Sequence, residues 1–263
     1  MTDSLLHHED GGPRDAPAVL LAGSLGTTLR MWDPQVDVLR EDHGLRAIAY
    51  DQLGHGASPA PPGPYTIERL GQAALALMDH LQLARASFAG VSIGGMVGQW
   101  LAAHAPDRID RLVLLCTSAH LPPPAFWHDR ARTVRDAGTV DVIADAVVAR
   151  WLTPGFAEAN PGTVATLRAM LAGQPPEGYA ACCDAIAAMD QRADLAGIRA
   201  STLVIGGAQD AAIPPAHQEH LAAVIPGARL QILDPGAHVV SVERADVVTD
   251  LIADHLDRES ATP

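Results

Sequence analysis

The sequence contains no lysine, and its 18 fixed cationic side chains are all arginine. Without lysine the chain cannot form a Schiff base with a carbonyl substrate, nor use a serine–lysine pair in catalysis. The formal net charge is −13, and no basic stripe offsets it, which argues against nucleic acid and anionic membranes as partners. An anionic group of a substrate must therefore be bound by arginine, histidine or backbone N–H groups.

Cysteine is also scarce, and its three residues suggest packing roles rather than a disulfide framework: Cys116, Cys182 and Cys183. No Cys/His spacing is typical of a metal site, so we expect neither a metal ion nor another cofactor. No apolar run is long enough to span a bilayer, and the N-terminus is polar and acidic rather than a secretory or transit signal. We therefore expect a cytoplasmic protein with no membrane partner.

What the chain does contain is a regular alternation of short apolar runs and helical patterns. Six apolar runs predict buried strands, at residues 18–22, 45–50, 86–91, 112–116, 202–206 and 230–233. Helical spacing of apolar residues predicts helices at residues 67–83, 93–105 and 242–256. This alternation is typical of an α/β fold, a mostly parallel twisted sheet with helices on both faces.

Residues 121–195 interrupt this alternation, because they contain no convincing strand and are divided into helical pieces by proline and glycine. The segment follows the fourth strand, above the expected carboxyl ends of the strands. We therefore predict a helical cap, or lid, inserted in the core, with a decorative extension as the alternative. The core then comprises residues 1–120 and 196–263, of which residues 259–263 are expected to be a frayed tail.

The pattern Gly-x-Ser-x-Gly at Gly90, Ser92 and Gly94 lies between a predicted strand and a predicted helix. In that setting it indicates a nucleophile elbow. The residues two before and two after the serine crowd one another in so sharp a turn, so only small ones fit. The hydroxyl then stands at a helix N-terminus, where N–H groups stabilise an oxyanion. We predict that Ser92 is a nucleophile; the alternative is a solvated serine in a glycine-rich turn.

A nucleophilic serine needs a general base and an acid that orients the base. In this kind of sheet the acid and then the histidine follow the serine along the chain. The base is predicted at His238, in a loop of small residues after the last strand, and the acid at Asp210, after the strand 202–206. His55 and Asp234 are the rivals, and we expect each of them to shape its own turn instead.

An oxyanion hole needs two backbone N–H donors. One is predicted at Ile93, immediately after the nucleophile. The other is predicted in the loop after the first core strand, where Ser24 is the first candidate and Leu25 the second. Loss of one such donor costs about 3–4 kcal/mol of transition-state stabilisation in other enzymes, so this loop is more than a connection.

Together these motifs resemble the α/β-hydrolase superfamily. Four stretches are similar to those of 3-oxoadipate enol-lactonases of the β-ketoadipate pathway, at residues 23–35, 63–68, 150–154 and 177–186. The resemblance covers nearly the whole chain from Leu5 onward. It departs at the N-terminus, where only residues 5–8 remain and the first of the family's two early strands looks missing or replaced. It also departs at Gln52, near the place where many relatives have an arginine.

The resemblance implies that a Ser-His-Asp triad opens an enol-lactone to 3-oxoadipate through an acyl-enzyme. It also implies that Arg150, in the matching Arg-Trp stretch, binds the substrate carboxylate; an ion pair with an aspartate of the cap is the alternative. Trp127 and Trp151 either line the pocket or pack in the core. The expected partner is a small-molecule lactone or ester, and the sequence does not distinguish a monomer from a homo-oligomer.

Other functions stay open at this point. A carboxylesterase, a methyl esterase or a carbon–carbon bond hydrolase would carry the same triad, and only the cap separates them. A small-molecule receptor of the same fold can also retain a triad. Aspartate at the elbow, which dehalogenases and epoxide hydrolases of this superfamily carry, is replaced here by Ser92.

Overall fold

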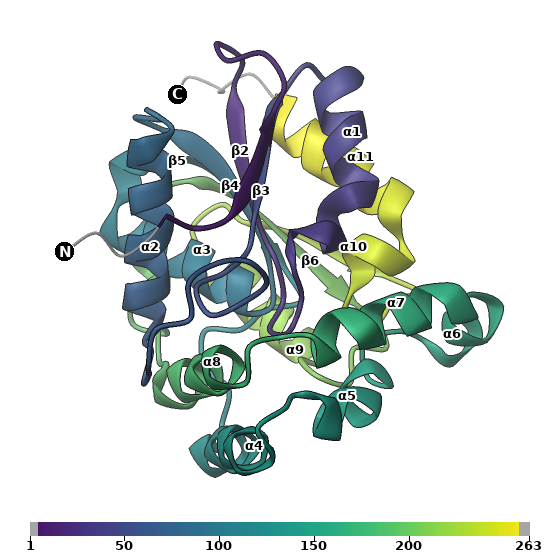
Figure 1. Ribbon diagram of the computed structural model, residues 1–263. Helices are drawn as coiled ribbons and strands as arrows, with labels where there is room; N and C mark the ends of the chain where they lie inside the picture. Colours follow the sequence, from purple (N-terminus) through teal and green to yellow (C-terminus); the bar gives the residue numbers. More distant parts are fainter. Residues whose placement is uncertain (1–4, 258–263) are drawn as a thin grey trace.

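The computed structural model describes residues 5–257, in which helices cover both faces of a seven-stranded sheet (Figure 1). The strand order is β1-β3-β2-β4-β5-β6-β7; β1 runs antiparallel to β3, and every other neighbouring pair is parallel. The fold class predicted from the sequence is confirmed. The strands are β1 His8–Gly11, β2 Ala18–Ala22, β3 Arg46–Tyr50, β4 Ala86–Val91, β5 Ile109–Leu115, β6 Ser201–Gly207 and β7 Arg229–Leu233.

The central strands are mostly apolar because both of their faces are covered. Every residue of β2, β3 and β4 is buried. Leu20 of β2 lies in register with Ile48 of β3 on one side and Phe88 of β4 on the other. Complete burial of each such side chain contributes roughly 1.5–3 kcal/mol. The carboxyl ends of the parallel strands therefore share one edge, where the loops that follow them meet.

Helices on the two faces close the core (Figure 1). One face carries α1 Asp33–Glu41, α10 Val240–Glu243 and α11 Ala245–Asp257, and the other carries α2 Ile67–His80 and α3 Ile93–His104. Helix α9 Pro215–Val224 packs against β6 and β7. Short 3-10 turns are η1 Leu29–Trp32, η2 Pro106–Arg108 and η3 Leu195–Gly197. No helix within residues 5–257 is long and apolar enough to cross a membrane.

Five helices lie between β5 and β6 and gather at one end of the sheet (Figure 1). We call residues 121–195 the insertion; its helices are α4 Pro124–Ala137, α5 Asp141–Val148, α6 Pro154–Ala159, α7 Pro161–Ala172 and α8 Pro176–Ala188. The insertion contains no strand, as expected, and α4, α6, α7 and α8 each have proline in the first turn. Proline has the helical φ and lacks an N–H that would be unpaired there, so the breaks in the sequence are helix starts.

Two details differ from the expected elements. One strand that no apolar run indicated, β1 at His8–Gly11, precedes β2 and pairs antiparallel with β3. As a short polar strand at the sheet edge, it carries no apolar signal. The closing helix expected at residues 242–256 is two helices, α10 and α11, because the backbone leaves the helical region at Arg244 (φ −126°, ψ 44°). The expected tail, residues 259–263, lies outside the described residues.

The three cysteines are free and buried, as packing residues should be. Burial raises the pKa of the Cys116 thiol well above its usual range, and the Asp210 carboxylate adds to the shift. Burial likewise raises the pKa of Cys182, and raises that of Cys183 to about 12. These thiols therefore stay protonated and unreactive at neutral pH.

Two buried histidines are held in their neutral form by their hydrogen bonds. Nε2 of His255 donates to the carbonyl of Ser201 (3.0 Å), while Nδ1 accepts from Arg229 (2.9 Å). Nε2 of His55 accepts from the N–H of Gly26 (2.8 Å). Burial lowers the pKa of His55 and that of His255 from 6.5 to about 4.

We expect these two histidines to make the fold sensitive to mild acid. The unfolded chain takes up the protons near pH 6.5 and the native chain only near pH 4, so the free energy of unfolding falls as the pH decreases through this window. Each histidine accounts for about 1.4 kcal/mol per pH unit. Urea unfolding between pH 7 and pH 4.5 measures the slope. His255→Gln should reduce the slope by the contribution of one histidine, about 1.4 kcal/mol per pH unit. An unchanged slope would show that the pKa of His255 is not lowered by folding.

Candidate active site

Ser92 stands at the turn between β4 and α3 with a backbone that L-residues rarely adopt, φ 58° and ψ −117°. Three hydrogen bonds hold it there. Its N–H donates to the carbonyl of Leu115 on β5 (2.9 Å), and its carbonyl accepts from the N–H of Met96 (3.0 Å) and from Oγ1 of Thr117 (2.6 Å). A strained residue costs about 1–3 kcal/mol and clusters at functional sites. The strain here belongs to the predicted nucleophile.

The two glycines of the elbow are required by close backbone contacts. A Cβ on Gly90 would lie 2.3 Å from the carbonyl carbon of Gly94. A Cβ on Gly94 would lie 2.4 Å from the carbonyl oxygen of Ala22, at the end of β2. The crowding expected from the motif is therefore present, and it brings the elbow against the loop that follows β2.

His238 and Asp210 meet across the loops that follow β7 and β6. Nδ1 of His238 lies 2.9 Å from Oδ2 of Asp210, and both residues are 3% exposed. The other carboxylate oxygen, Oδ1, accepts from the N–H groups of Ala212 (2.8 Å) and Ile213 (2.9 Å). Because an ionised carboxylate only accepts, Nδ1 carries the ring proton and Nε2 is left as the basic nitrogen.

The rival residues are engaged elsewhere. Oδ1 of Asp234 accepts from Nε2 of Gln209 (2.8 Å), and Oε1 of Gln209 accepts from the N–H of Gly236 (2.9 Å). This bridge fastens the loop that carries Asp210 to the loop that carries His238. Nε2 of His55 accepts from the N–H of Gly26, in the loop after β2 rather than in the turn that His55 was expected to shape.

The loop after β2 favours Leu25 over Ser24 as the second oxyanion donor. The N–H of Ser24 is directed at the sulfur of Met31 (3.3 Å). The N–H groups of Leu25 and Ile93 donate to no protein acceptor within residues 5–257. The next N–H along, that of Gly26, is fixed on His55. Of the two candidates drawn from the sequence, Leu25 is therefore the one whose N–H has no acceptor in the described part of the chain.

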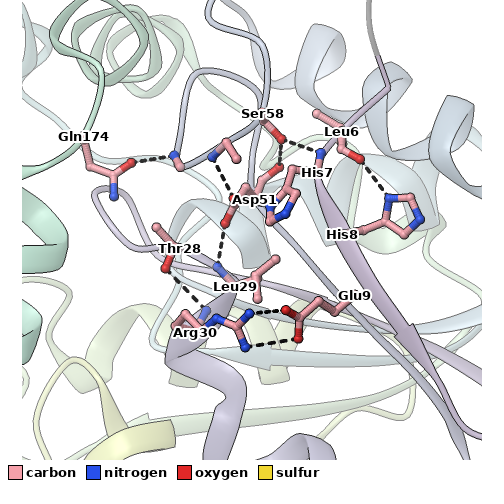
Figure 2. Close-up of polar contacts among 12 residues, drawn as sticks. Leu6, His7, His8, Glu9, Thr28, Leu29, Arg30, Asp51, Ser58 and Gln174 are labelled. Atoms are coloured by element: carbon pink, nitrogen blue, oxygen red, sulfur yellow. Dashed lines mark hydrogen bonds and ion pairs between the residues drawn. The ribbon is translucent and has the colours of Figure 1, made fainter.

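Asp51, at the end of β3, anchors this loop (Figure 2). Oδ1 of its buried carboxylate accepts from the N–H of Leu29 (2.7 Å), and Oδ2 lies 2.8 Å from Nδ1 of His7. Ser58 donates to the carbonyl of Asp51 (2.7 Å) and accepts from the N–H of His7 (2.9 Å). Figure 2 also shows Gln174 of the insertion reaching this network, where it accepts from the N–H of Gly56 (2.8 Å).

A cleft lies between the core and the insertion. Ser92 and His238 both line it, together with Ser24 and Leu25. The insertion contributes aromatic, aliphatic and cationic side chains: Phe126, Trp127, Arg130, Val147, Arg150, Trp151 and Tyr179. The loop that carries Asp210 contributes Ala212 and Ile213.

Two arginines line the cleft, one of them missed by the sequence analysis. Arg150 donates to the carbonyl of Ala211 rather than to an aspartate of the insertion. The missed residue, Arg130, places its guanidinium 4.7 Å from the ring centre of Phe126 and 5.0 Å from that of Trp127. Within residues 5–257 neither arginine has a carboxylate oxygen within 4.0 Å. The available signal was the spacing from Trp127 to Arg130, which puts both on one helix face.

Both tryptophans named from the sequence reach the cleft while packing within the protein. Nε1 of Trp127 donates to the carbonyl of Leu121 (3.1 Å), which fixes the ring at the start of α4. Trp151 is 3% exposed and follows α5 directly. Each tryptophan therefore lines the cleft and also packs against the rest of the protein, so the two alternatives left open by the sequence do not exclude each other.

The profile of the alpha/beta hydrolase fold family matches residues 17–245. The chain belongs to this family, as its elbow and strand order indicate. The expected class, a carboxylic-ester hydrolase, is confirmed by the relatives it has.

Among those relatives, 3-oxoadipate enol-lactonase 2 of Acinetobacter baylyi is 40% identical over 242 residues, which are 92% of this chain and 89% of that protein. The crystal structure of the enol-lactonase from Burkholderia xenovorans LB400 is 44% identical, with a TM-score of 0.92 and 96% of each chain covered. A thermophilic esterase from Thermogutta terrifontis is 29% identical, with a TM-score of 0.88, over 95% of this chain and 92% of that one.

We expect Gly90→Ala to destabilise the protein by at least about 3 kcal/mol, because the new methyl group meets only backbone atoms, which cannot rotate away. Gly162→Ala in α7 is the control, since a Cβ there meets nothing within 4 Å, and its effect should stay within about 1 kcal/mol. Urea unfolding of the purified variants measures both. A Gly90→Ala protein with wild-type stability would show that the elbow is not tightly packed.

Proposed function

We propose that this protein hydrolyses 3-oxoadipate enol-lactone, with Ser92, His238 and Asp210 as its catalytic triad. The observation that carries the proposal is the shared cleft. A strained serine and an aspartate-bound histidine line it beside two arginines that lack carboxylate partners. The enol-lactonases among the relatives, at 40% and 44% identity, support this choice of substrate.

In the first half-reaction, Oγ of Ser92 attacks the lactone carbonyl carbon while Nε2 of His238 takes its proton. Asp210, held by two backbone N–H groups, orients the imidazole and stabilises its cationic form. The N–H groups of Leu25 and Ile93 donate hydrogen bonds to the carbonyl oxygen and stabilise the negative charge that develops on it. The ring C–O bond then breaks, and the enolate oxygen takes the proton from Nε2 of His238, which leaves an enol and a neutral imidazole. The enolate is a good leaving group, so this step asks little of the general acid.

In the second half-reaction, water hydrolyses the acyl-enzyme, which still carries the enol because the substrate is a ring. His238 removes a proton from the water while the water attacks the acyl-enzyme. The oxyanion that forms is stabilised by the same two N–H groups. The bond to Ser92 breaks and the serine regains its proton from His238. One water is consumed; the product gains a second carboxylate, and its enol tautomerises to the ketone of 3-oxoadipate.

Arg150 and Arg130 bind the carboxylate of the substrate in this proposal. They reach the cleft from different parts of the insertion, one after α5 and one on α4. A guanidinium in a cleft lined by aromatic rings pairs strongly with a carboxylate, because little water screens the pair. The insertion thereby acts as the cap that covers the substrate, and it supplies the charge that a protein of net charge −13 otherwise lacks.

Ser92→Ala is expected to lower kcat by about 10⁴-fold or more, since a triad without its nucleophile retains only binding and oxyanion stabilisation. The decay of enol-lactone absorbance measures turnover, beside an aryl ester and a saturated lactone. Good ester turnover with none of the enol-lactone would reject the substrate and keep the hydrolase. A receptor would keep its ligand response in Ser92→Ala, whereas a hydrolase loses turnover.

Arg130→Gln and Arg150→Gln should each raise KM for the anionic enol-lactone about tenfold or more, the loss of one charge-assisted contact. KM for a neutral aryl ester should change less than about twofold. Arg132→Gln on the same helix is the control, because Arg132 pairs at the surface with Asp129. Equal effects of a cleft variant on both substrates would remove its role in binding the carboxylate.

A further inference from the structure

Glu243 is a buried carboxylate at the end of α10 that the proposed chemistry does not use. Its Oε2 accepts from the N–H of Ala237 (2.9 Å), and its Oε1 accepts from the N–H of Thr153 (3.2 Å) and from the hydroxyl of Thr153. Within residues 5–257 it forms no ion pair. The carboxylate of Glu243 is therefore hydrogen-bonded only to uncharged donors in the described residues, and these come from two segments that are distant in sequence, at Thr153 and Ala237.

Both segments belong to the cleft. Ala237 directly precedes His238, and Val239, which directly follows it, donates its N–H to the carbonyl of Trp151 (2.9 Å). The backbone on each side of the histidine is thus fastened to the short segment between α5 and α6, once directly and once through Glu243. That segment, residues 150–153, also carries Arg150 and Trp151, which line the cleft.

A packing role alone does not account for a carboxylate in this place. An isolated buried charge is costly, and an apolar residue of similar volume is often as stabilising as a buried polar group. A carboxylate has two oxygens and up to four acceptor sites, so it can hold donors from two loops at once. Hydrogen bonds to an ionised acceptor are also shorter and stronger than those between neutral groups.

We propose that Glu243 is a positioning residue that couples the His238 loop to residues 150–153 of the insertion. Any displacement of that segment, including one caused by a ligand on Arg150, is passed to the imidazole through Thr153, Glu243 and Ala237. The inference rests on the proposed function for the role of His238, and it adds a link between substrate contact and the general base.

The test uses an aryl ester, which needs the triad but not the carboxylate contacts. Thr153→Val removes the hydroxyl donor, and Thr153→Ser keeps it. Thr249→Val is the matched control, because Thr249 is buried in α11 and its hydroxyl bonds only to the carbonyl of Ala245 (2.7 Å). Glu243→Leu removes every hydrogen bond that Glu243 makes to Thr153 and Ala237, and leaves the direct bond from Val239 to Trp151 in place. For every variant, kcat is calculated from the concentration of folded protein, and the unfolding midpoint is measured by circular dichroism.

Glu243→Leu and Thr153→Val should each lower kcat about tenfold or more, with KM changed less than twofold. Thr153→Ser should recover kcat to within about twofold of wild type, and Thr249→Val should leave it unchanged. The double variant Glu243→Leu/Thr153→Val should be no slower than Glu243→Leu alone, because both break one link. Unchanged kcat in folded Glu243→Leu protein, or losses that multiply in the double variant, would overturn the proposal.

A second measurement does not depend on turnover. The Nδ1 proton of His238, hydrogen-bonded to Asp210, is read by proton NMR in each variant and assigned with His238→Gln. The signal should shift or broaden in Glu243→Leu and Thr153→Val, and stay in place in Thr153→Ser and Thr249→Val. An unmoved signal in Glu243→Leu would overturn the coupling. Failure of wild-type protein to hydrolyse the enol-lactone would reject the proposed substrate alone.

Discussion

The positive φ of Ser92 is the constraint on which the rest of the site depends. The serine can be held there only if β5 supplies acceptor and donor groups beside it, and only if β2 and α3 approach without side chains between them. Gly90 and Gly94 permit that approach. The same approach places the loop after β2 against the N-terminus of α3, so the strained serine and this loop meet in one packing arrangement.

Each loop of the site is fastened to a neighbouring segment by a side-chain hydrogen bond. Asp51 holds the loop after β2, Gln209 joins the loops after β6 and β7, and Glu243 joins the last of these to the insertion. In each bridge a side-chain oxygen accepts from a backbone N–H of a neighbouring segment. The parallel strands bring the loops to one edge, and the polar bridges join the loops to one another there.

The sheet could be predicted because it depends on local sequence, namely apolar runs. Ser92, Asp210 and His238 could be singled out as candidates for a similar reason, from small residues around a serine and from loops after strands. The polar strand β1 could not, since an edge strand needs no apolar pattern. Arg130 could not be assigned either, because its place depends on how α4 packs over the core. The choice between Ser24 and Leu25 required knowledge of which N–H meets Met31, a contact seven residues away.

The proline that begins α4 has a consequence for the cleft. An α-helix turns by about 100° per residue, so a start displaced by one residue would rotate every side chain of the helix by that amount. Pro124 resists such a displacement, because its ring fixes the first helical φ and excludes an extra turn before it. The rotation of Trp127 and Arg130 about the axis of α4 therefore depends on Pro124, a few residues upstream.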